Sequence, residues 1–128
     1  MQNLIHYTLH LIFPALIAYV FFRKEWKKAY FILLCTLLID IDHLFANPIF
    51  AANRCSIGFH PLHSLYIIPV YIGLLFFKKP LRIVAIGLLF HLFTDFIDCL
   101  FIFSKCKACV ANNVLANFIH NILEFFGF

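Results

Sequence analysis

The chain has 128 residues, of which 64% are hydrophobic and only 12% are charged. Its mean hydropathy of +0.96 exceeds what a soluble domain of this size sustains, because a small domain leaves much of its surface in water. Composition therefore excludes an ordinary soluble domain and predicts an integral membrane protein. The net charge of +4 does not predict a nucleic-acid partner, since the basic residues form short clusters beside apolar segments.

Four apolar segments, at residues 3–22, 29–45, 65–77 and 81–103, each predict a transmembrane helix. The third is short for a full span, so either the residues before it extend the helix or the bilayer is locally thin. A last segment, 113–128, predicts an amphipathic helix that lies on the membrane or caps the bundle. With no linker or internal repeat, the sequence predicts one all-α membrane domain over residues 1–128.

Two connections between these segments are basic and predict the orientation. Residues 23–28 include four basic side chains, and residues 78–82 include three. By the positive-inside rule both connections face the cytoplasm, in a bacterial inner membrane. The N-terminus, the 47–63 loop and the C-terminal segment are then expected on the periplasmic side.

Ionisable side chains recur at one depth in three of the predicted spans. At about 1.5 Å per residue, His10, Asp40 and Asp95 lie ~18–20 Å from the basic ends of their helices. Each span also places its ionisable residues on one face. These sets are His6 with His10, Asp40 with His43, and His91 with Asp95 and Asp98. The loop before the third span adds two histidines, so all four helices are expected to contribute to one layer.

Unpaired carboxylates in hydrocarbon cost at least about 2.5 kcal/mol each, and a divalent cation bound by imidazole and carboxylate groups compensates several at once. We therefore predict a metal site near the outer face that holds one or two ions, Zn²⁺ or alternatively Mn²⁺. The predicted ligands are His10, Asp40, His43, His60, His63, His91 and Asp95. The structural alternatives are hydrogen-bonded His–Asp pairs, a solvated helix end at 40–43 and interfacial histidines. His10 is favoured over His6, and His120 is expected to be an ordinary interfacial residue.

The five cysteines divide by predicted depth. Cys55, Cys106 and Cys109 are expected outside the membrane, where a disulfide can form, and their pairing stays open. Cys35 and Cys99 fall within predicted spans and are expected to be packing residues.

The order of these motifs resembles a known group of membrane proteins. An early histidine pair precedes Leu-Ile-Asp-Ile-Asp-His at 38–43, Gly-Phe-His-Pro-Leu-His-Ser at 58–64 and His-Leu-Phe-Thr-Asp at 91–95. The pattern resembles the YdjM-like (DUF457-type) membrane-bound metal-dependent hydrolases, and more closely the DUF6122 family of small bacterial membrane proteins. The resemblance implies that the motif positions are Asp40, Asp42, His43, His63, His91 and Asp95, with His10 and His60 matching as well. The chain has His-Pro-Leu-His where the hydrolases have a His-Arg-Gly-x-Thr-His form.

These features predict a membrane-bound hydrolase that acts on a phosphoester or lipid-like substrate at the outer face. A bound ion would lower the pKa of a water molecule to about 7 and polarise the scissile group. The predicted general base is Asp42 or Asp98, whichever is not committed to metal. Arg54 is predicted to bind a substrate phosphate, with lipid headgroups as the alternative partner.

Two other functions stay open. The cluster can serve non-enzymatic binding or transport of a divalent metal or protons. Transport requires a polar path to the cytoplasm, and the inner halves of the spans contain almost no ionisable residue. The chain can also be a packing subunit of a larger assembly, which would be stable without metal.

Overall fold

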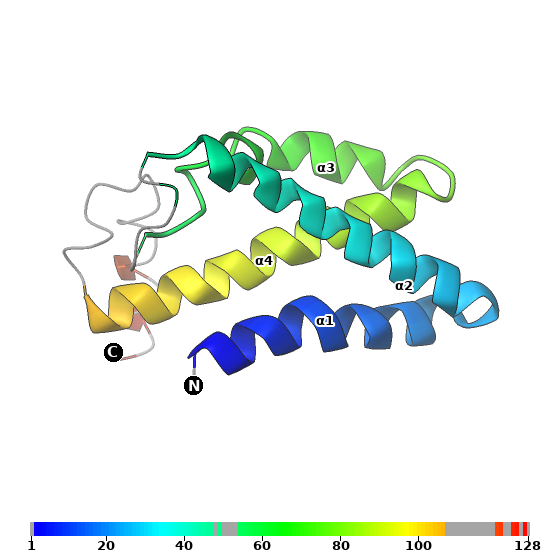
Figure 1. Cartoon of the computed structure of the whole chain (residues 1–128), viewed down its shortest axis with the longest axis horizontal. Helices are drawn as coiled ribbons and strands as arrows, with labels where there is room; N and C mark the ends of the chain where they lie inside the picture. The colour runs from blue at the N-terminus through cyan, green and yellow to red at the C-terminus, as the bar shows by residue number, and fades with distance from the viewer. Residues whose placement is uncertain are drawn as a thin grey trace.

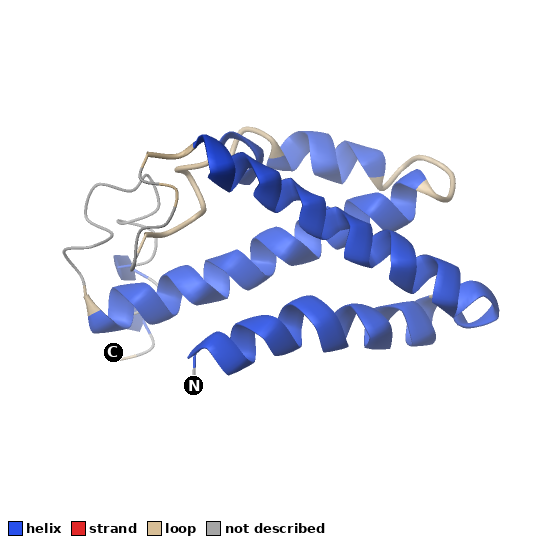
Figure 2. Cartoon of the chain, in the orientation of Figure 1, coloured by secondary structure: helices blue, strands red, loops and turns tan. Residues whose placement is uncertain are grey.

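The computed structural model is a bundle of helices, and the residues that it describes include no strand (Figure 2). Described are residues 2–47, 49, 54–106, 120, 121, 124, 125 and 127. The elements are α1 (Gln2–Phe21), η1 (Arg23–Glu25), α2 (Trp26–Cys35), η2 (Thr36–Phe45), η3 (Pro61–His63), α3 (Ile68–Leu74) and α4 (Leu81–Lys105), where η marks a 3₁₀ helix. The all-α prediction is confirmed. The predicted helix at 113–128 falls largely outside the described residues.

The longest helix, α4, is the central element of the bundle. It contacts α1, α2, η2 and α3, and Figure 1 shows it crossing beneath α2 and η2. The helices α1 and α2 lie side by side and are joined by η1. Any side chain that α4 directs inward therefore meets groups from several other elements.

Two helices are long and apolar enough to cross a membrane: α1 over Leu4–Phe21 and α4 over Leu81–Lys105. The second predicted span begins as α2 but changes at Thr36 into the 3₁₀ helix η2. The third predicted span is represented by only seven helical residues in α3. The finer expectation of four transmembrane helices therefore stays a prediction.

Two apolar clusters lie toward opposite ends of the bundle. One includes Ala18, Phe22, Ala29, Leu33 and Ile83, and the other includes Cys55, Ile57, Cys99, Ile102 and Phe103. The largest fully buried side chains are His60, His63, His91, Thr94 and Cys99. Four of these five are polar, which is unusual for a helical bundle because buried polar groups need partners.

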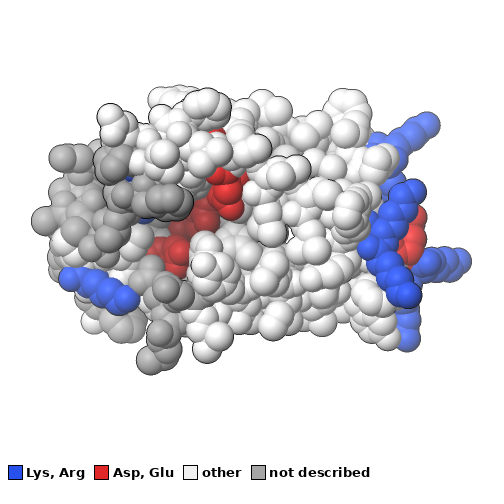
Figure 3. All heavy atoms as spheres, viewed as in Figure 1, with Lys and Arg blue, Asp and Glu red and all other residues white. Residues whose placement is uncertain are grey.

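The two basic connections meet at one end of the molecule. Lys79 Nζ donates a hydrogen bond of 2.6 Å to Glu25 Oε1, which joins the α3–α4 connection to η1. The ammonium group of Lys79 lowers the pKa of Glu25 below its usual range. Figure 3 shows Lys and Arg side chains gathered at this end, with acidic side chains visible in a recess toward the other end. The two connections thus lie at the same end of the fold, as the shared orientation that was predicted for them requires.

A disulfide between Cys55 and Cys99 ties the loop before η3 to α4. Cys99 is fully buried in an apolar cluster, as predicted for a packing residue. Its disulfide was not predicted, and it forms because α4 continues to Lys105 and Cys99 meets the loop near the C-terminal end of the helix. The packing prediction is wrong for Cys35, which is a free, exposed thiol on the surface of the bundle. Cys106 is also disulfide-bonded, and Cys109 lies outside the described residues.

Gly87 of α4 lies at a close contact between α4 and η2. A Cβ atom at this position would lie 2.6 Å from both Cγ2 and Oγ1 of Thr36, so rotation of the threonine cannot relieve the clash. Thr36 is further fixed by the hydrogen bond that its hydroxyl donates to Leu33 O. Gly87 therefore sets how closely η2 approaches α4.

Replacement of Gly87 by alanine should lower the free energy of unfolding by about 1–3 kcal/mol, because the added methyl group overpacks this contact. The measurement is the thermal midpoint of the purified protein in detergent. Gly73→Ala is the matched control, since its Cβ would meet nothing within 4 Å and alanine favours a helix. Equal midpoints for the two variants would contradict the close approach.

Candidate metal centre

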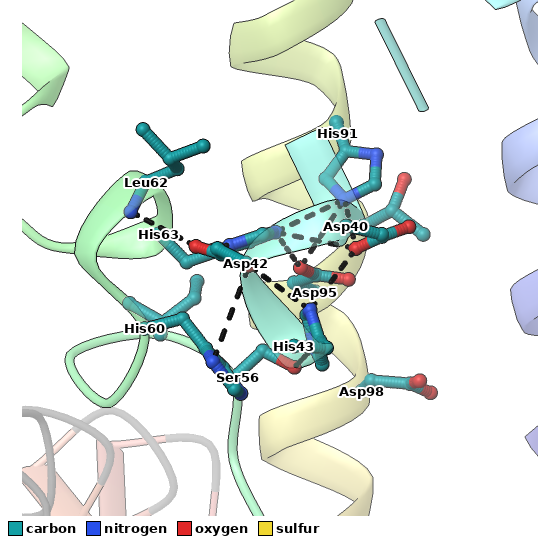
Figure 4. Close-up of polar contacts among 12 residues, drawn as sticks. Asp40, Asp42, His43, Ser56, His60, Leu62, His63, His91, Asp95 and Asp98 are labelled. Atoms are coloured by element: carbon teal, nitrogen blue, oxygen red, sulfur yellow. Dashed lines mark hydrogen bonds and ion pairs between the residues drawn. The ribbon is translucent and has the colours of Figure 1, made fainter. Parts of the chain in front are cut away.

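Four side chains from three elements converge in the bundle interior: Asp40 of η2, His63 of η3, and His91 and Asp95 of α4 (Figure 4). His63 Nε2 lies 3.2 Å from His91 Nε2, 3.1 Å from Asp95 Oδ2 and 3.5 Å from Asp40 Oδ1. His91 Nε2 lies 3.2 Å from Asp40 Oδ1 and 3.5 Å from Asp95 Oδ2. We call these four residues the central group.

The spacing of the central group fits one tetrahedral ion. Nitrogen and oxygen ligands at about 2.0–2.1 Å from a tetrahedral Zn²⁺ are separated from one another by about 3.3 Å. The five ligand-to-ligand distances given above lie between 3.1 and 3.5 Å. The donor set of two imidazoles and two carboxylates also suits Zn²⁺ and Mn²⁺.

Protons can satisfy the central group only by crowding like groups together. If His63 Nε2 and His91 Nε2 both carry protons, each N–H reaches a carboxylate oxygen, Asp95 Oδ2 at 3.1 Å and Asp40 Oδ1 at 3.2 Å, but the two N–H groups also lie 3.2 Å apart. If neither does, two nitrogen lone pairs and two carboxylate oxygens, all acceptors, crowd one point. A divalent cation removes this conflict because it binds every one of these atoms through a lone pair.

Local helix geometry accounts for three of these positions. His91 and Asp95 are separated by one turn of α4 and so project from the same face. Asp40 lies in η2, where three residues make one turn. Residue 42 therefore points about a third of a turn away from Asp40, toward the loop before α3.

The remaining ligand, His63, lies on a loop whose conformation is determined by residues of the loop itself. Gly58 has a φ of 80°, a conformation that favours glycine, and its amide donates a hydrogen bond to His63 O. Pro61 starts the short 3₁₀ helix η3. Tyr71 of α3 donates a hydrogen bond of 3.2 Å to Leu62 O, which fixes the loop against the bundle. His63 is thereby fully buried.

Asp42 supports the central group from behind His63. Its Oδ2 lies 3.1 Å from His63 Nδ1 and accepts a 2.9 Å hydrogen bond from the Leu62 amide. When Nδ1 donates its proton to Asp42, the lone pair of Nε2 is directed into the central group. A carboxylate behind a metal-binding histidine is a common arrangement, because it fixes the ring orientation and makes the ligand more basic.

His43 and His60 lie in a neighbouring group around Asp42. Their rings stack with centroids 3.9 Å apart. His43 Nδ1 is 3.1 Å from Asp42 Oδ1, its Nε2 is 3.1 Å from Ser56 Oγ, and His60 Nδ1 is 4.0 Å from Asp42 Oδ1. We call Asp42, His43 and His60 the outer group; their atoms are also close enough to hold an ion.

The predicted ligand His10 lies in a third group, with His6 of the same helix and Asp95 of α4. His10 Nε2 is 3.7 Å from Asp95 Oδ1. His6 Nδ1 is 2.6 Å from Asp98 Oδ2, and Figure 4 shows Asp98 further along α4, apart from the central group. All seven predicted ligands are therefore brought together, but in three adjoining groups.

A cavity of about 340 Å³, lined largely by polar and ionisable side chains, opens beside these groups. It is lined by His6, Asp40, His43, Leu44, Ile49, Ser56, Asp95 and Asp98. Asp40 is 48% exposed, whereas the other three members of the central group are buried. The central group thus has one accessible side, as catalytic metal sites have and closed structural sites do not.

The predicted phosphate ligand Arg54 lies at the edge of this region. Its guanidinium donates a 2.8 Å hydrogen bond to Ile49 O, a residue of the cavity wall, and lies 4.6 Å from the Phe59 ring centre. Its substrate-binding role stays a prediction. His120 is half exposed beside Glu124, in agreement with an ordinary surface residue.

Sequence reasoning missed three contributors to the site: Ser56, the Leu62 amide and Tyr71. A backbone amide has no signature in the residue pattern, and a loop serine or a helical tyrosine has no characteristic spacing. Only their nearness to the 58–64 motif could have suggested them.

The fold and the site define an all-α protein with apolar helices and buried His/Asp groups that can bind a metal ion. A family model matches residues 1–102, and the chain belongs to that family, DUF6122, a family of unknown function. No curated protein and no solved structure matches the chain. The comparisons give no support to the resemblance to the YdjM-like hydrolases.

Asp42→Asn should weaken metal binding about 10–100-fold without changing how many ions bind, because the carboxylate orients His63 and is not itself a member of the central group. A titration against a chromophoric zinc chelator measures the affinity. Ser56→Ala is the matched control, since Ser56 contacts His43 and no member of the central group. A wild-type affinity in Asp42→Asn, or an equal loss in both variants, would contradict the positioning role.

Proposed function

We propose that the protein is a membrane-embedded, metal-dependent hydrolase that acts on a phosphoester or lipid-like substrate at the outer, periplasmic face of the bacterial inner membrane. The observation that carries the proposal is the central group: two imidazoles and two carboxylates at tetrahedral spacing, with one side open to a polar cavity. Hydrolysis is the reaction that such a site supports with water as the only co-substrate.

The apolar exterior supports a membrane location. Large apolar side chains are exposed on α1, α2, η2, α3 and α4, among them Leu4, Phe31, Phe45, Val70 and Phe93. A soluble monomer rarely exposes so much apolar surface. Only 17% of the apolar stretch Leu4–Phe21 is buried inside the protein. In this proposal α2 with η2, and α3 with its flanking turns, complete four spans.

The distribution of charge and disulfides supports the orientation. Lysines and arginines collect at the η1 end, as expected for the cytoplasmic side. The Cys55–Cys99 disulfide lies toward the opposite end, near the 54–60 loop, and disulfides persist in oxidising compartments such as the periplasm. The cavity then opens at the level of the outer headgroups.

The residues of the site have distinct roles in this proposal. A bound ion supplies a Lewis acid and acidifies a water molecule. Asp40, His63, His91 and Asp95 hold the ion, and Asp42 orients His63. Hydrolysis breaks the P–O or acyl C–O bond as the water oxygen adds; Asp98, which lines the cavity, takes the proton of water, and the leaving oxygen is protonated in turn. Asp42 is 4% exposed and accepts hydrogen bonds from the loop, so Asp98 suits the role of base better.

The interior toward the basic end favours an enzyme over a transporter. Beyond His10 and His91 the described interior is lined mainly by apolar residues such as Pro14, Ile17 and Phe90, around a cavity of only about 10 Å³. The one hydroxyl in this lining, that of Thr36, is bonded to Leu33 O. The apolar cluster around Ala18 and Leu33 follows. An ion bound at the central group therefore meets no polar route to the basic end among the described residues.

Removal of metal should abolish hydrolysis. We expect purified protein to release p-nitrophenol from p-nitrophenyl phosphate, bis-p-nitrophenyl phosphate or p-nitrophenyl butyrate, with activity at least about 100-fold lower after chelation. Zn²⁺ or Mn²⁺ should restore it, and His91→Ala should not be restored. His120→Ala is the control for a distant surface histidine. Metal bound without hydrolysis of any of these probes or of phospholipid vesicles would favour a non-enzymatic role instead.

The orientation is tested with two engineered cysteines in a Cys35→Ser background. A membrane-impermeant maleimide added to intact bacterial cells should label Phe59→Cys, which lies on the exposed loop, and should label Lys78→Cys only after permeabilisation. The reverse pattern would place the site on the cytoplasmic side.

A further inference from the structure

A second ion-binding position adjoins the central group on the side of α1. His6 and His10 face Asp95 from one side of that helix, and one ligand atom from each of the three residues lies within 4.8 Å of the others. Sites of this kind form between facing helices of bundles, where side chains one turn apart project into the same space.

The carboxylate of Asp95 reaches both positions. Its Oδ2 is 3.1 Å from His63 Nε2 in the central group. Its Oδ1 is 3.7 Å from His10 Nε2. Two ligands of one ion at about 2.1 Å can be at most about 4.2 Å apart, so the second pair also fits a shared cation. A carboxylate that contributes one oxygen to each of two ions holds them at a fixed separation.

The hydrogen bonding of the His10 side chain is incomplete without such an ion. The residue is 6% exposed, and its Nε2 has no hydrogen-bond partner. This nitrogen points toward the Asp95 carboxylate at a distance too long for a hydrogen bond. A buried imidazole nitrogen without a partner is costly, and metal coordination would satisfy it.

The outer group offers a weaker second position. Its carboxylate, Asp42, is already committed to His63 Nδ1, the Leu62 amide and His43 Nδ1. His43 also uses its Nε2 with Ser56. His60 Nε2 has no hydrogen-bond partner, as is true of His10 Nε2. Hydrogen bonds nevertheless account for Asp42 and for both ring nitrogens of His43, whereas the Asp95 carboxylate faces the unpartnered His10 Nε2 directly.

We infer that the protein binds two divalent cations, one in the central group and one between His6, His10 and Asp95, with Asp95 bridging them. The inference rests on the proposed central metal site and extends it to a two-metal centre. The polar cavity touches Asp40 of the first position, His6 of the second and the shared Asp95. A substrate phosphoryl group in this cavity can thus face both ions, as in two-metal phosphoryl hydrolysis.

The test is the metal content of purified protein loaded with Zn²⁺ and freed of excess ion, measured by elemental analysis against protein concentration. Wild type should contain about two ions per chain, and His10→Gln about one. His6→Gln should behave like His10→Gln, and because His6 is 30% exposed its replacement disturbs packing less. Circular dichroism and thermal unfolding show that each variant is folded. Loading with Mn²⁺ should give an EPR spectrum of magnetically coupled ions in wild type and of an isolated ion in both variants.

His60→Gln is the matched control, because it removes a buried histidine from the outer group and should leave two ions bound. Loss of one ion in His60→Gln but not in His10→Gln would overturn the assignment in favour of the outer group. One ion in wild type, unchanged in His10→Gln, would overturn the second position and leave the central site standing. No bound ion in wild type would refute both the inference and the proposed function.

Discussion

The cost of burying carboxylates in an apolar interior is the constraint on which this structure depends. Asp42 and Asp95 are almost completely buried, and His63 and His91 beside them are more so. Such groups are tolerated when each has an opposite charge, a hydrogen bond or a metal ion. The bundle arranges three elements and one loop so that these side chains meet one another instead of lipid.

The consequences extend from the site to the fold. The short approach at Gly87 brings η2 against α4, and that contact sets the distance from Asp40 to His91. The Cys55–Cys99 disulfide and the hydrogen bond from Tyr71 hold the loop that buries His63. Packing contacts outside the central group therefore determine its ligand geometry. Small changes at these distant contacts should alter that geometry.

Much of the site followed from helical spacing. His91 with Asp95, and His6 with His10, are one turn apart, and counting depth from the basic ends correctly predicted that they meet. Three features could not be predicted in this way. Asp40 lies in the central group and Asp42 lies behind His63 only because residues 36–45 form a 3₁₀ helix. The orientation of His60 away from the central group depends on the turn at Gly58, and the Cys55–Cys99 pair depends on how far α4 extends beyond the site.

The central claim concerns which atoms surround the ion, and X-ray absorption at the zinc edge of the purified, zinc-loaded protein tests it directly. The account predicts only nitrogen and oxygen ligands at about 2.0–2.1 Å, together with the outer-shell scattering of imidazole rings. A sulfur ligand at about 2.3 Å would instead place the zinc at cysteines. That result, or a spectrum without imidazole scattering, would contradict the metal centre described above.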